Sequence, residues 1–311
     1  MYSFHPSPDV RGGVSSGGLL EHVQSFLACP SCKGTLIFRE SDCTCDSCGH
    51  AFVMVDETYR LRMDPITDEE IQYKKGLRVW IRGQPAAYRL AKLFSPIFSR
   101  YPHPKRIFGQ QATLGDIILD IGSGNQRNHP SFVNVDILAN DEVDIIADAR
   151  ELPFKDSSID GIVSIVSLEH IPRSDLALDE FSRVLKQGGR SFIVVPFMQP
   201  LHASPSDFKR WTIAGLTEDL DRVGIDVVRS GIAAGPASTM AWMTAEFLSL
   251  VLSLGIRRVR NAISLPLQVL CSPIKWFDIL LARMPGAEVL ASSIWVEAIR
   301  RSDETSPDGV A

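Results

Sequence analysis

The chain has 311 residues, of which 45% are hydrophobic and 22% charged, and its formal net charge is −5. This composition is that of a globular protein, and the length allows one large domain with a smaller one. The negative charge excludes a general electrostatic attraction to nucleic acid. The first residues are rich in Gly, Ser and Pro and lack a basic region followed by an apolar core, so we expect a disordered tail and no signal peptide. A cytoplasmic location, where thiols stay reduced, follows from this expectation.

Four cysteines near the N-terminus form two C-x-x-C pairs, Cys29 with Cys32 and Cys45 with Cys48. Each pair can place two thiolates on one knuckle turn, and two knuckles close a tetrahedral zinc site. So small a segment has little core of its own, and metal binding would supply much of its folding energy. We therefore expect a structural zinc ribbon with no open position for catalysis, and we expect Cys43 to take no part in it. A set of reduced thiols is the alternative.

The rest of the chain alternates strand-like and helix-like segments. Strands are predicted at residues 116–121, 132–135, 143–147, 161–166, 191–195, 225–228 and 291–301. One helix is predicted at 174–186, with Ser174 as its N-cap and Gly188-Gly189 as its stop, and another at 212–223, ended by Gly224. This alternation predicts a doubly wound α/β sheet that binds its ligand beyond the carboxyl ends of the strands.

The glycine turn after the first of these strands discriminates between cofactors. It reads ILDIGSGNQRN, so Gly122 and Gly124 are followed by Arg127 where a dinucleotide fingerprint has its third glycine. Asp136 comes too early for the ribose-binding acid of an NAD domain, and the loop is too short for a full helix. The missing glycine argues against a dinucleotide more than against S-adenosylmethionine, which has no pyrophosphate to place at a helix N-terminus.

Five motifs follow one another in order: ILDIGSG, NVDI, IIADARELPF, IDGIVSIVSLEHI and RVLKQGGR. In this order they resemble the successive motifs of class I S-adenosylmethionine-dependent methyltransferases of the type 11 group, over residues 116–228. The resemblance implies a Rossmann-like, seven-stranded methyltransferase sheet whose last two strands form an antiparallel hairpin. It also implies a set of cofactor-binding residues: Asp120, Gly122, Ser123, Gly124, Asp136, Ile137, Asp148, Ala149 and Ser167.

These residues have distinct expected roles. The two glycines let the backbone approach the cofactor without a Cβ clash. Asp136 is placed to accept hydrogen bonds from the ribose hydroxyls. By resemblance, Asp148 accepts from the adenine amino group and Ile137 packs on the adenine ring. Asp120 is expected to orient the amino group of the cofactor, directly or through water. The alternative is that Asp136 and Asp148 merely cap strand ends.

Two histidines follow strands at the same edge, His170 in SLEHI and His202 in PFMQPLHASPSDFKRWT. A histidine can take the proton from an oxygen nucleophile, although either residue could instead bond to loop backbone. The second loop also carries Asp207, Arg210 and Trp211, a set that suits a hydroxylated acceptor with Trp211 as a stacking face. It resembles a segment of bacterial type 11 methyltransferases linked to surface-polysaccharide assembly. We predict O-methylation of a saccharide or similar small molecule, with His170 or His202 as the catalytic base.

The ribbon leaves two other functions open. A four-cysteine ribbon ahead of a methyltransferase resembles the Trm112-like module and the ribbon of ribosomal-RNA guanine methyltransferases. A ribosomal-RNA methyltransferase should carry a basic groove, and the acidic chain with no Lys/Arg cluster in its ribbon argues against nucleic acid as a partner. A non-catalytic binding protein with a vestigial cofactor site is the third interpretation.

An apolar insertion separates the last two predicted strands. Its residues 241–256 carry only Glu246 as a charge and are too few to span a membrane. Arginines and tryptophans follow, which suits a helix pair at the inner face of a membrane; a cap on the core or a dimer interface is the alternative. The expected organisation is a disordered tail (1–24), zinc ribbon (25–62), helical linker (63–114), methyltransferase domain (115–235 and 291–301), helical insertion (236–290) and second disordered tail (302–311).

Overall fold

The computed structural model describes residues 22–39, 41–55, 58–64, 85–109, 115–202 and 206–302. Most of the first predicted tail, nearly all of the second and residues 65–84 of the predicted linker lie outside the described residues.

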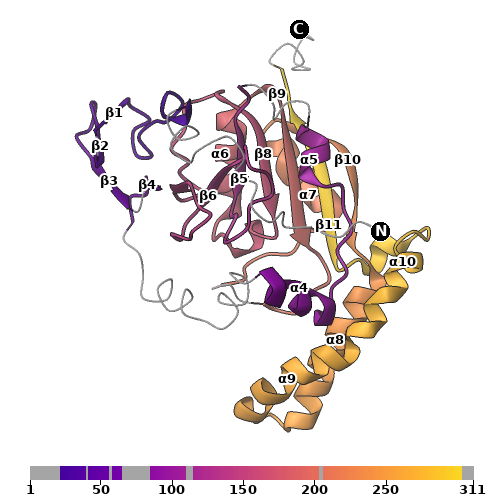
Figure 1. Ribbon diagram of the computed structural model, residues 1–311. Coiled ribbons are helices and arrows are strands. Elements are labelled where there is room, and N and C mark those ends of the chain that lie inside the picture. Colours follow the sequence, from indigo (N-terminus) through magenta and orange to yellow (C-terminus); the bar gives the residue numbers. More distant parts are fainter. Residues whose placement is uncertain are drawn as a thin grey trace.

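A mostly parallel sheet runs through the main domain in the order β7-β6-β5-β8-β9-β11-β10 (Figure 1). Its strands are β5 (Ile118–Ile121), β6 (Val133–Asp136), β7 (Ile145–Ile146), β8 (Ile159–Ile165), β9 (Leu185–Pro196), β10 (Ile225–Ala234) and β11 (Ser293–Arg300). Strands β5 to β9 pair in parallel, whereas β10 and β11 form an antiparallel hairpin beside β9. All four residues of β5 are buried, as expected for a central strand that is covered on both faces. The predicted doubly wound sheet and its closing hairpin are confirmed.

The helices of the main domain are α5 (Pro104–Phe108), α6 (Ser174–Val184) and α7 (Ile213–Arg222). Helix α7 begins one residue after its predicted start, because Thr212 is its N-cap: the Thr212 side chain accepts a hydrogen bond from the Gly215 amide. Helix α6 starts at Ser174, the first residue of the predicted range, but its predicted N-cap and its predicted end are wrong. Its N-cap is Arg173, whose backbone is left-handed (φ 55°), and Ser174 is already the first helical residue. The helix ends at Val184, and the two glycines lie within β9.

The N-terminal segment extends the main sheet. Strands β1 (Leu36–Phe38), β2 (Asp42–Cys45), β3 (Ala51–Val55) and β4 (Thr58–Arg60) form an antiparallel ribbon. The last of them, β4, also pairs in parallel with β7, which places Tyr59 opposite Ile145. Leu27 and Leu61 belong to the same buried cluster as Phe154 of the main domain. The ribbon therefore shares its core with the large domain.

The insertion between β10 and β11 is helical, as predicted, and it projects from one end of the sheet (Figure 1). It contains α8 (Pro236–Ser253), α9 (Arg257–Cys271), η2 (Ser272–Phe277), α10 (Asp278–Leu281) and η3 (Ala287–Leu290). Asp278 accepts from the amides of Ala237 and Ser238 at 2.8 and 2.9 Å and so satisfies the first turn of α8. Helix α4 (Pro85–Phe94) lies against the base of the insertion through η2.

Candidate cofactor and acceptor site

The loop after β5 requires glycine at two positions. Gly122 and Gly124 both have left-handed backbones, with φ of 73° and 57°. A Cβ built on Gly122 would lie 2.4 Å from the Cβ of Ser167, which no side chain can accommodate. Ser167 itself donates to the carbonyl of Ile121 at 3.0 Å. The glycine loop thus lies directly against the chain that follows β8. Ser167 and the glycine loop share the carboxyl edge of the sheet, where the sequence predicts the cofactor.

Asp136, at the end of β6, holds this loop in place. Its two carboxylate oxygens accept from the amides of Gly124 at 2.8 Å and Leu138 at 2.9 Å. A carboxylate has about four acceptor sites, so these bonds leave capacity for the ribose hydroxyls. Asp136 therefore caps the strand end, as the alternative interpretation expected, and its ribose contact stays a prediction.

Asp148 is held by the side chain of Arg150, whose guanidinium donates to both carboxylate oxygens at 2.6 to 3.1 Å. Burial raises the pKa of Asp148, but the hydrogen bonds from Arg150 outweigh it and lower the pKa overall. Arg62 lies nearby and donates to the carbonyl of Ile137 at 3.3 Å. Arg62 comes from the end of the ribbon and was not predicted, because its contact joins segments 75 residues apart in sequence. The predicted adenine contacts of Asp148, Ile137 and Ala149 stay untested.

Asp120 is nearly inaccessible, with 1% of its surface exposed. Its carboxylate accepts from the Asn128 side chain at 2.7 Å, and burial raises its pKa to about 7. This burial argues against direct contact between Asp120 and the cofactor. Asp120 could orient the amino group of the cofactor only indirectly, through Asn128 or a water molecule.

Arg127 fixes the position of the loop between β5 and β6, where a dinucleotide-binding domain would have a helix. No helix is present between β5 and β6 in residues 122–132, all of which the structure describes. The Arg127 guanidinium instead binds Glu142 at 3.0 Å, Asp144 at 2.9 Å and the carbonyl of Phe132 at 3.0 Å. These bonds tie the loop to the segment between β6 and β7. Because the loop contains no helix N-terminus, a ligand here would have to bind to the backbone amides and side chains of the loop.

Two buried polar atoms of this loop suit a ligand. The Ser123 hydroxyl and the side-chain oxygen of Asn125 have no hydrogen-bond partner among the residues that the structure describes. Buried polar groups are nearly always satisfied, so such atoms indicate a missing partner. The hydroxyl and amino groups of S-adenosylmethionine would provide one, and the residues present fit this cofactor.

The two predicted histidines lie together. His170 ends η1 (Leu168–His170), and His202 follows β9; their ring centroids are 5.3 Å apart and perpendicular. Their Nε2 atoms lie 3.7 and 3.8 Å from the same carboxylate oxygen of Glu169. The Nδ1 of His170 contacts the carbonyl of Ser206 at 2.6 Å, and that of His202 contacts the carbonyl of Pro200 at 3.1 Å. Glu169 was not singled out from the sequence, although it precedes His170 directly.

The remaining predicted substrate residues shape the second loop. Asp207 binds the Arg210 guanidinium and accepts from the His202 amide at 2.8 Å. Burial raises the pKa of Asp207, but these bonds hold it at about 2. Both residues thus position the loop that carries His202. Trp211 is 3% exposed and donates to Asp219 at 2.8 Å, so its burial argues against the predicted stacking on an acceptor.

Trp242 offers a ring closer to the site. It is half-buried on α8, and its ring centroid lies 5.3 Å from that of His202. No local pattern indicates this contact, because it joins the insertion to a distant loop. The insertion therefore borders the acceptor side of the site.

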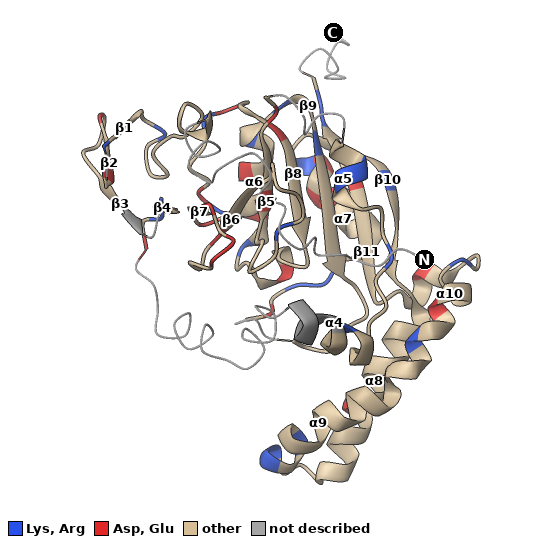
Figure 2. Cartoon of the chain, viewed as in Figure 1, with Lys and Arg blue, Asp and Glu red and all other residues tan. Residues whose placement is uncertain are grey.

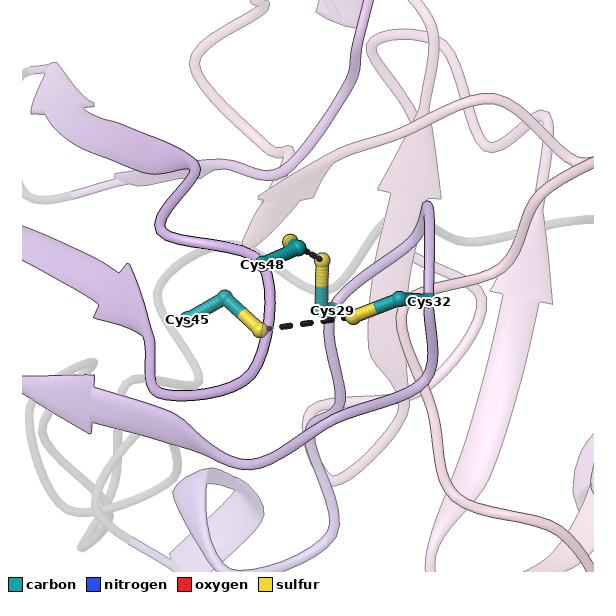
Figure 3. A group of neighbouring side chains, drawn as sticks. All are labelled: Cys29, Cys32, Cys45 and Cys48. Carbon is teal, nitrogen blue, oxygen red and sulfur yellow. Dashed lines mark hydrogen bonds between the residues drawn. The ribbon is translucent and has the colours of Figure 1, made fainter.

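The four predicted zinc ligands also converge (Figure 3). The sulfurs of Cys29 and Cys48 lie 3.7 Å apart, and those of Cys32 and Cys45 lie 3.4 Å apart. Sulfurs at about 2.3 Å from a tetrahedral zinc ion are roughly 3.8 Å apart, so the geometry fits one such ion. Cys43 is buried in β2, opposite Phe52, and is not part of this cluster.

Comparison with known proteins finds a family match over the central part of the chain. Residues 119–193 match the type 11 methyltransferase domain. The ubiquinone/menaquinone biosynthesis C-methyltransferase of Psychromonas ingrahamii is 37% identical over 108 residues, which cover 33% of this chain and 40% of that protein. The sterol 4-C-methyltransferase of Caenorhabditis elegans is 42% identical over 71 residues, 23% of this chain and 20% of that protein. The chain thus spans less than half the length of either relative.

Solved structures give similarities at low sequence identity. Phosphoethanolamine N-methyltransferase 2 of Haemonchus contortus is 14% identical with a TM-score of 0.44, over 76% of this chain and 61% of that one. The 1,6-didemethyltoxoflavin-N1-methyltransferase of Burkholderia thailandensis is 14% identical with a TM-score of 0.39, over 83% and 98%. The sequence match identifies the central part of this chain as a class I methyltransferase domain, a family whose methyl donor is S-adenosylmethionine.

Proposed function

We propose that this protein transfers a methyl group from S-adenosylmethionine to a hydroxyl group of a small-molecule acceptor, a saccharide. The observation that carries the proposal is the pair of histidines that follow β8 and β9 at the carboxyl edge of the sheet, the edge at which Ser167 packs against Gly122 of the glycine loop. Methyl transfer is a displacement at the sulfonium methyl, so the enzyme must align a nucleophile with it. A hydroxyl nucleophile also needs to lose its proton, and a histidine can accept it.

The acceptor has to be argued from this chain's own residues. The matched segment ends at residue 193, before His202 and the loop that carries it. The relatives are named for C-methylation of quinones and of a sterol, and those names describe the relatives alone. The polar loop around Asp207 and Arg210 favours a hydroxylated acceptor. Figure 2 shows blue and red segments mixed over the ribbon and the main sheet, which favours a small molecule over RNA as the acceptor.

Replacing either histidine tests the proposed chemistry. Removal of a general base costs a factor of about 10² to 10⁴ in rate. We expect His202→Ala or His170→Ala to slow turnover on this scale, while calorimetry shows nearly unchanged affinity for adenosylhomocysteine. The acceptor is sought by mass spectrometry of polysaccharide and lipid-linked glycan from a strain that lacks the protein. Methylation of ribosomal RNA by the purified protein, with binding that weakens steeply as salt rises, would contradict the saccharide proposal.

We also propose that the helical insertion contacts an anionic lipid surface, as a peripheral attachment at the inner face of the membrane. Helix α8 buries small residues along one face, namely Ala237, Ala241, Ala245, Ser249 and Ser253. Its large apolar side chains and those that follow it, such as Phe247 and Leu254, are exposed at 64% and 85%. This distribution is the reverse of that on a water-facing helix, and small residues between closely packed helices are typical of membrane proteins.

Charge at the tip of the insertion supports the same partner. Arg257 and Arg258, at the start of α9, are exposed there (Figure 2). Among the described residues, the helical stretch Arg257–Leu281 is long and apolar enough to cross a membrane, and most of its apolar part is not buried in the protein. Basic residues beside apolar ones suit binding to the headgroups and acyl boundary of an anionic membrane.

A further inference from the structure

Glu169 is a buried carboxylate beside two histidines. Its side chain has no exposed surface, and neither carboxylate oxygen has a hydrogen-bond partner among the residues that the structure describes. A buried ionised carboxylate is strongly disfavoured unless a cation or several donors compensate it. The Nε2 atoms of His170 and His202 lie at 3.7 and 3.8 Å, which is too long for a hydrogen bond.

The orientation of the two imidazoles indicates what compensates the carboxylate. A backbone carbonyl only accepts, so the Nδ1 of His170 carries the proton that it donates to Ser206. The Nδ1 of His202 faces two acceptors, the carbonyl of Pro200 at 3.1 Å and a carboxylate oxygen of Asp207 at 3.5 Å, and one donor, the Arg210 guanidinium at 3.3 Å. We assign the proton to Nδ1, because the nearest group is an acceptor and the Asp207 carboxylate also attracts it. A neutral imidazole that donates from Nδ1 has its lone pair on Nε2. Both lone pairs therefore lie on the side of Glu169, the arrangement that backbone carbonyls impose on metal-binding histidines.

We propose that Glu169, His170 and His202 bind a divalent transition-metal ion. Their ligand atoms lie within 4.8 Å of one another. Nitrogen and oxygen ligands at about 2.0–2.2 Å from one ion are roughly 3–4 Å apart, so small side-chain adjustments complete the site. Two histidines and one carboxylate leave coordination positions open, as in catalytic sites, and imidazole favours zinc or iron over magnesium or calcium. This site is separate from the four-cysteine cluster, which has no open position.

The role of this ion rests on the proposed function. An acceptor hydroxyl coordinated at an open position loses its proton to water more readily, because the ion lowers the hydroxyl pKa. The oxygen then forms the new bond to the methyl carbon as the carbon–sulfur bond breaks, and the bonding electron pair stays on sulfur in adenosylhomocysteine. With the ion bound, His170 and His202 hold the ion and water takes the proton, in place of the direct transfer to a histidine described above. Replacing either histidine slows turnover in both cases, and the zinc content of the variants distinguishes the ligand role from the base role.

Zinc stoichiometry of the full chain tests the site without an acceptor. Elemental analysis and calorimetry with Zn²⁺ should give two ions per wild-type chain, one in the ribbon and one at Glu169. Glu169→Gln keeps the side-chain shape but removes the charge, and His202→Gln removes a ligand. Each variant should retain one zinc and bind the second at least a hundredfold more weakly. His129→Gln is the matched control, because His129 bonds to Ser131 outside the cluster, and it should keep both ions.

Two results would overturn the proposal. One is a single zinc per wild-type chain at excess Zn²⁺; the other is a Glu169→Gln variant that binds the second ion as tightly as wild type. Circular dichroism and adenosylhomocysteine binding on the same samples establish that each variant is folded. A chain that binds adenosylhomocysteine but only one zinc contradicts the metal site alone. A chain that binds two zinc ions but no adenosylhomocysteine contradicts the proposed methyl transfer alone.

Discussion

Asp120, at the end of β5, links the stability of the fold to pH. The unfolded chain ionises this carboxyl near the ordinary aspartate pKa of 3.8, whereas burial raises the pKa to about 7 in the folded protein. The folded state therefore holds the proton more tightly. The contribution of the protonated Asp120 carboxyl to the free energy of unfolding is fully present below about pH 4 and is lost as pH rises through 7.

Asp120→Asn removes this titration while keeping a polar partner for Asn128. We expect the free energy of unfolding of the variant, relative to wild type, to increase steadily from pH 4 to pH 7. Urea unfolding at several pH values in this range measures the difference. Asp141→Asn, at an exposed carboxyl, is the control. A difference between variant and wild type that stays constant with pH would contradict the assigned titration.

Arg127 shows what a local pattern can predict and what it cannot. The shortness of the loop that contains it correctly indicated that no full helix follows β5. The sequence could not indicate that the guanidinium would bind Glu142 and Asp144, which lie fifteen and seventeen residues further along. Glu169 was overlooked for a similar reason: nothing local shows that a glutamate beside a histidine is buried and faces a second histidine from another loop.

At the scale of elements, Lys275 fastens α4 to the insertion. Its buried ammonium donates to the carbonyls of Lys92 and Leu93, at 3.0 and 2.6 Å, and to that of Ser95. These carbonyls end α4, where the helix dipole also favours a cation. Burial lowers the pKa of Lys275 to about 8.

Lys275→Met keeps the length of the side chain but leaves these carbonyls without their donor. We expect a loss of about 2–4 kcal/mol in the free energy of unfolding, because hydrogen bonds from charged donors contribute most and buried acceptors would stay unsatisfied. Protease cleavage near α4 should also become faster. The matched control is Lys105→Met, on α5, which should change stability little. Equal stability of Lys275→Met and wild type would show that α4 is held by other contacts.

Helix ends were predicted unevenly, for physical reasons. Thr212 caps α7 through its own side chain, a local interaction for which threonine is a favoured residue, and the predicted start differs by one residue. The start of α6 depends instead on the left-handed backbone of Arg173, which its residue type does not favour. Trp211 illustrates the same limit in packing, because an aromatic residue in a polar loop gives no indication that it joins the core.

At the scale of the whole molecule, the ribbon and the main sheet form one packed unit. Metal removal should therefore affect more than the ribbon, because β4 pairs with β7 and Leu27 shares the main core. We expect Cys45→Ser to lose the ribbon zinc and lower the melting temperature of the whole chain, and Cys43→Ser to retain the zinc. Elemental analysis and thermal unfolding measure both. Loss of zinc in Cys43→Ser with retention in Cys45→Ser would contradict the assigned ligands.

The insertion gives the molecule an exposed apolar surface on α8, the helix that also carries Trp242. If it binds an anionic membrane, the protein should sediment with phosphatidylglycerol vesicles and much less with phosphatidylcholine vesicles. Each arginine near such a surface contributes about 1 kcal/mol, so Arg257→Gln and Arg258→Gln should each weaken binding about fivefold. Phe247→Ser with Leu254→Ser should weaken it on both lipids, because these side chains supply apolar contact.

Val228→Ser, at a half-exposed position on β10 in the main sheet, is the control for this experiment and should bind vesicles as wild type does. The competing occupant is a second copy of the chain. Analytical ultracentrifugation distinguishes the two, since a dimer interface predicts a wild-type dimer that Phe247→Ser with Leu254→Ser converts to a monomer. A stable dimer without vesicle binding would contradict the membrane proposal. Vesicle binding that is weakened by replacing the two arginines would instead support membrane contact by the insertion, whose helix α8 links the bound end to Trp242 beside His202.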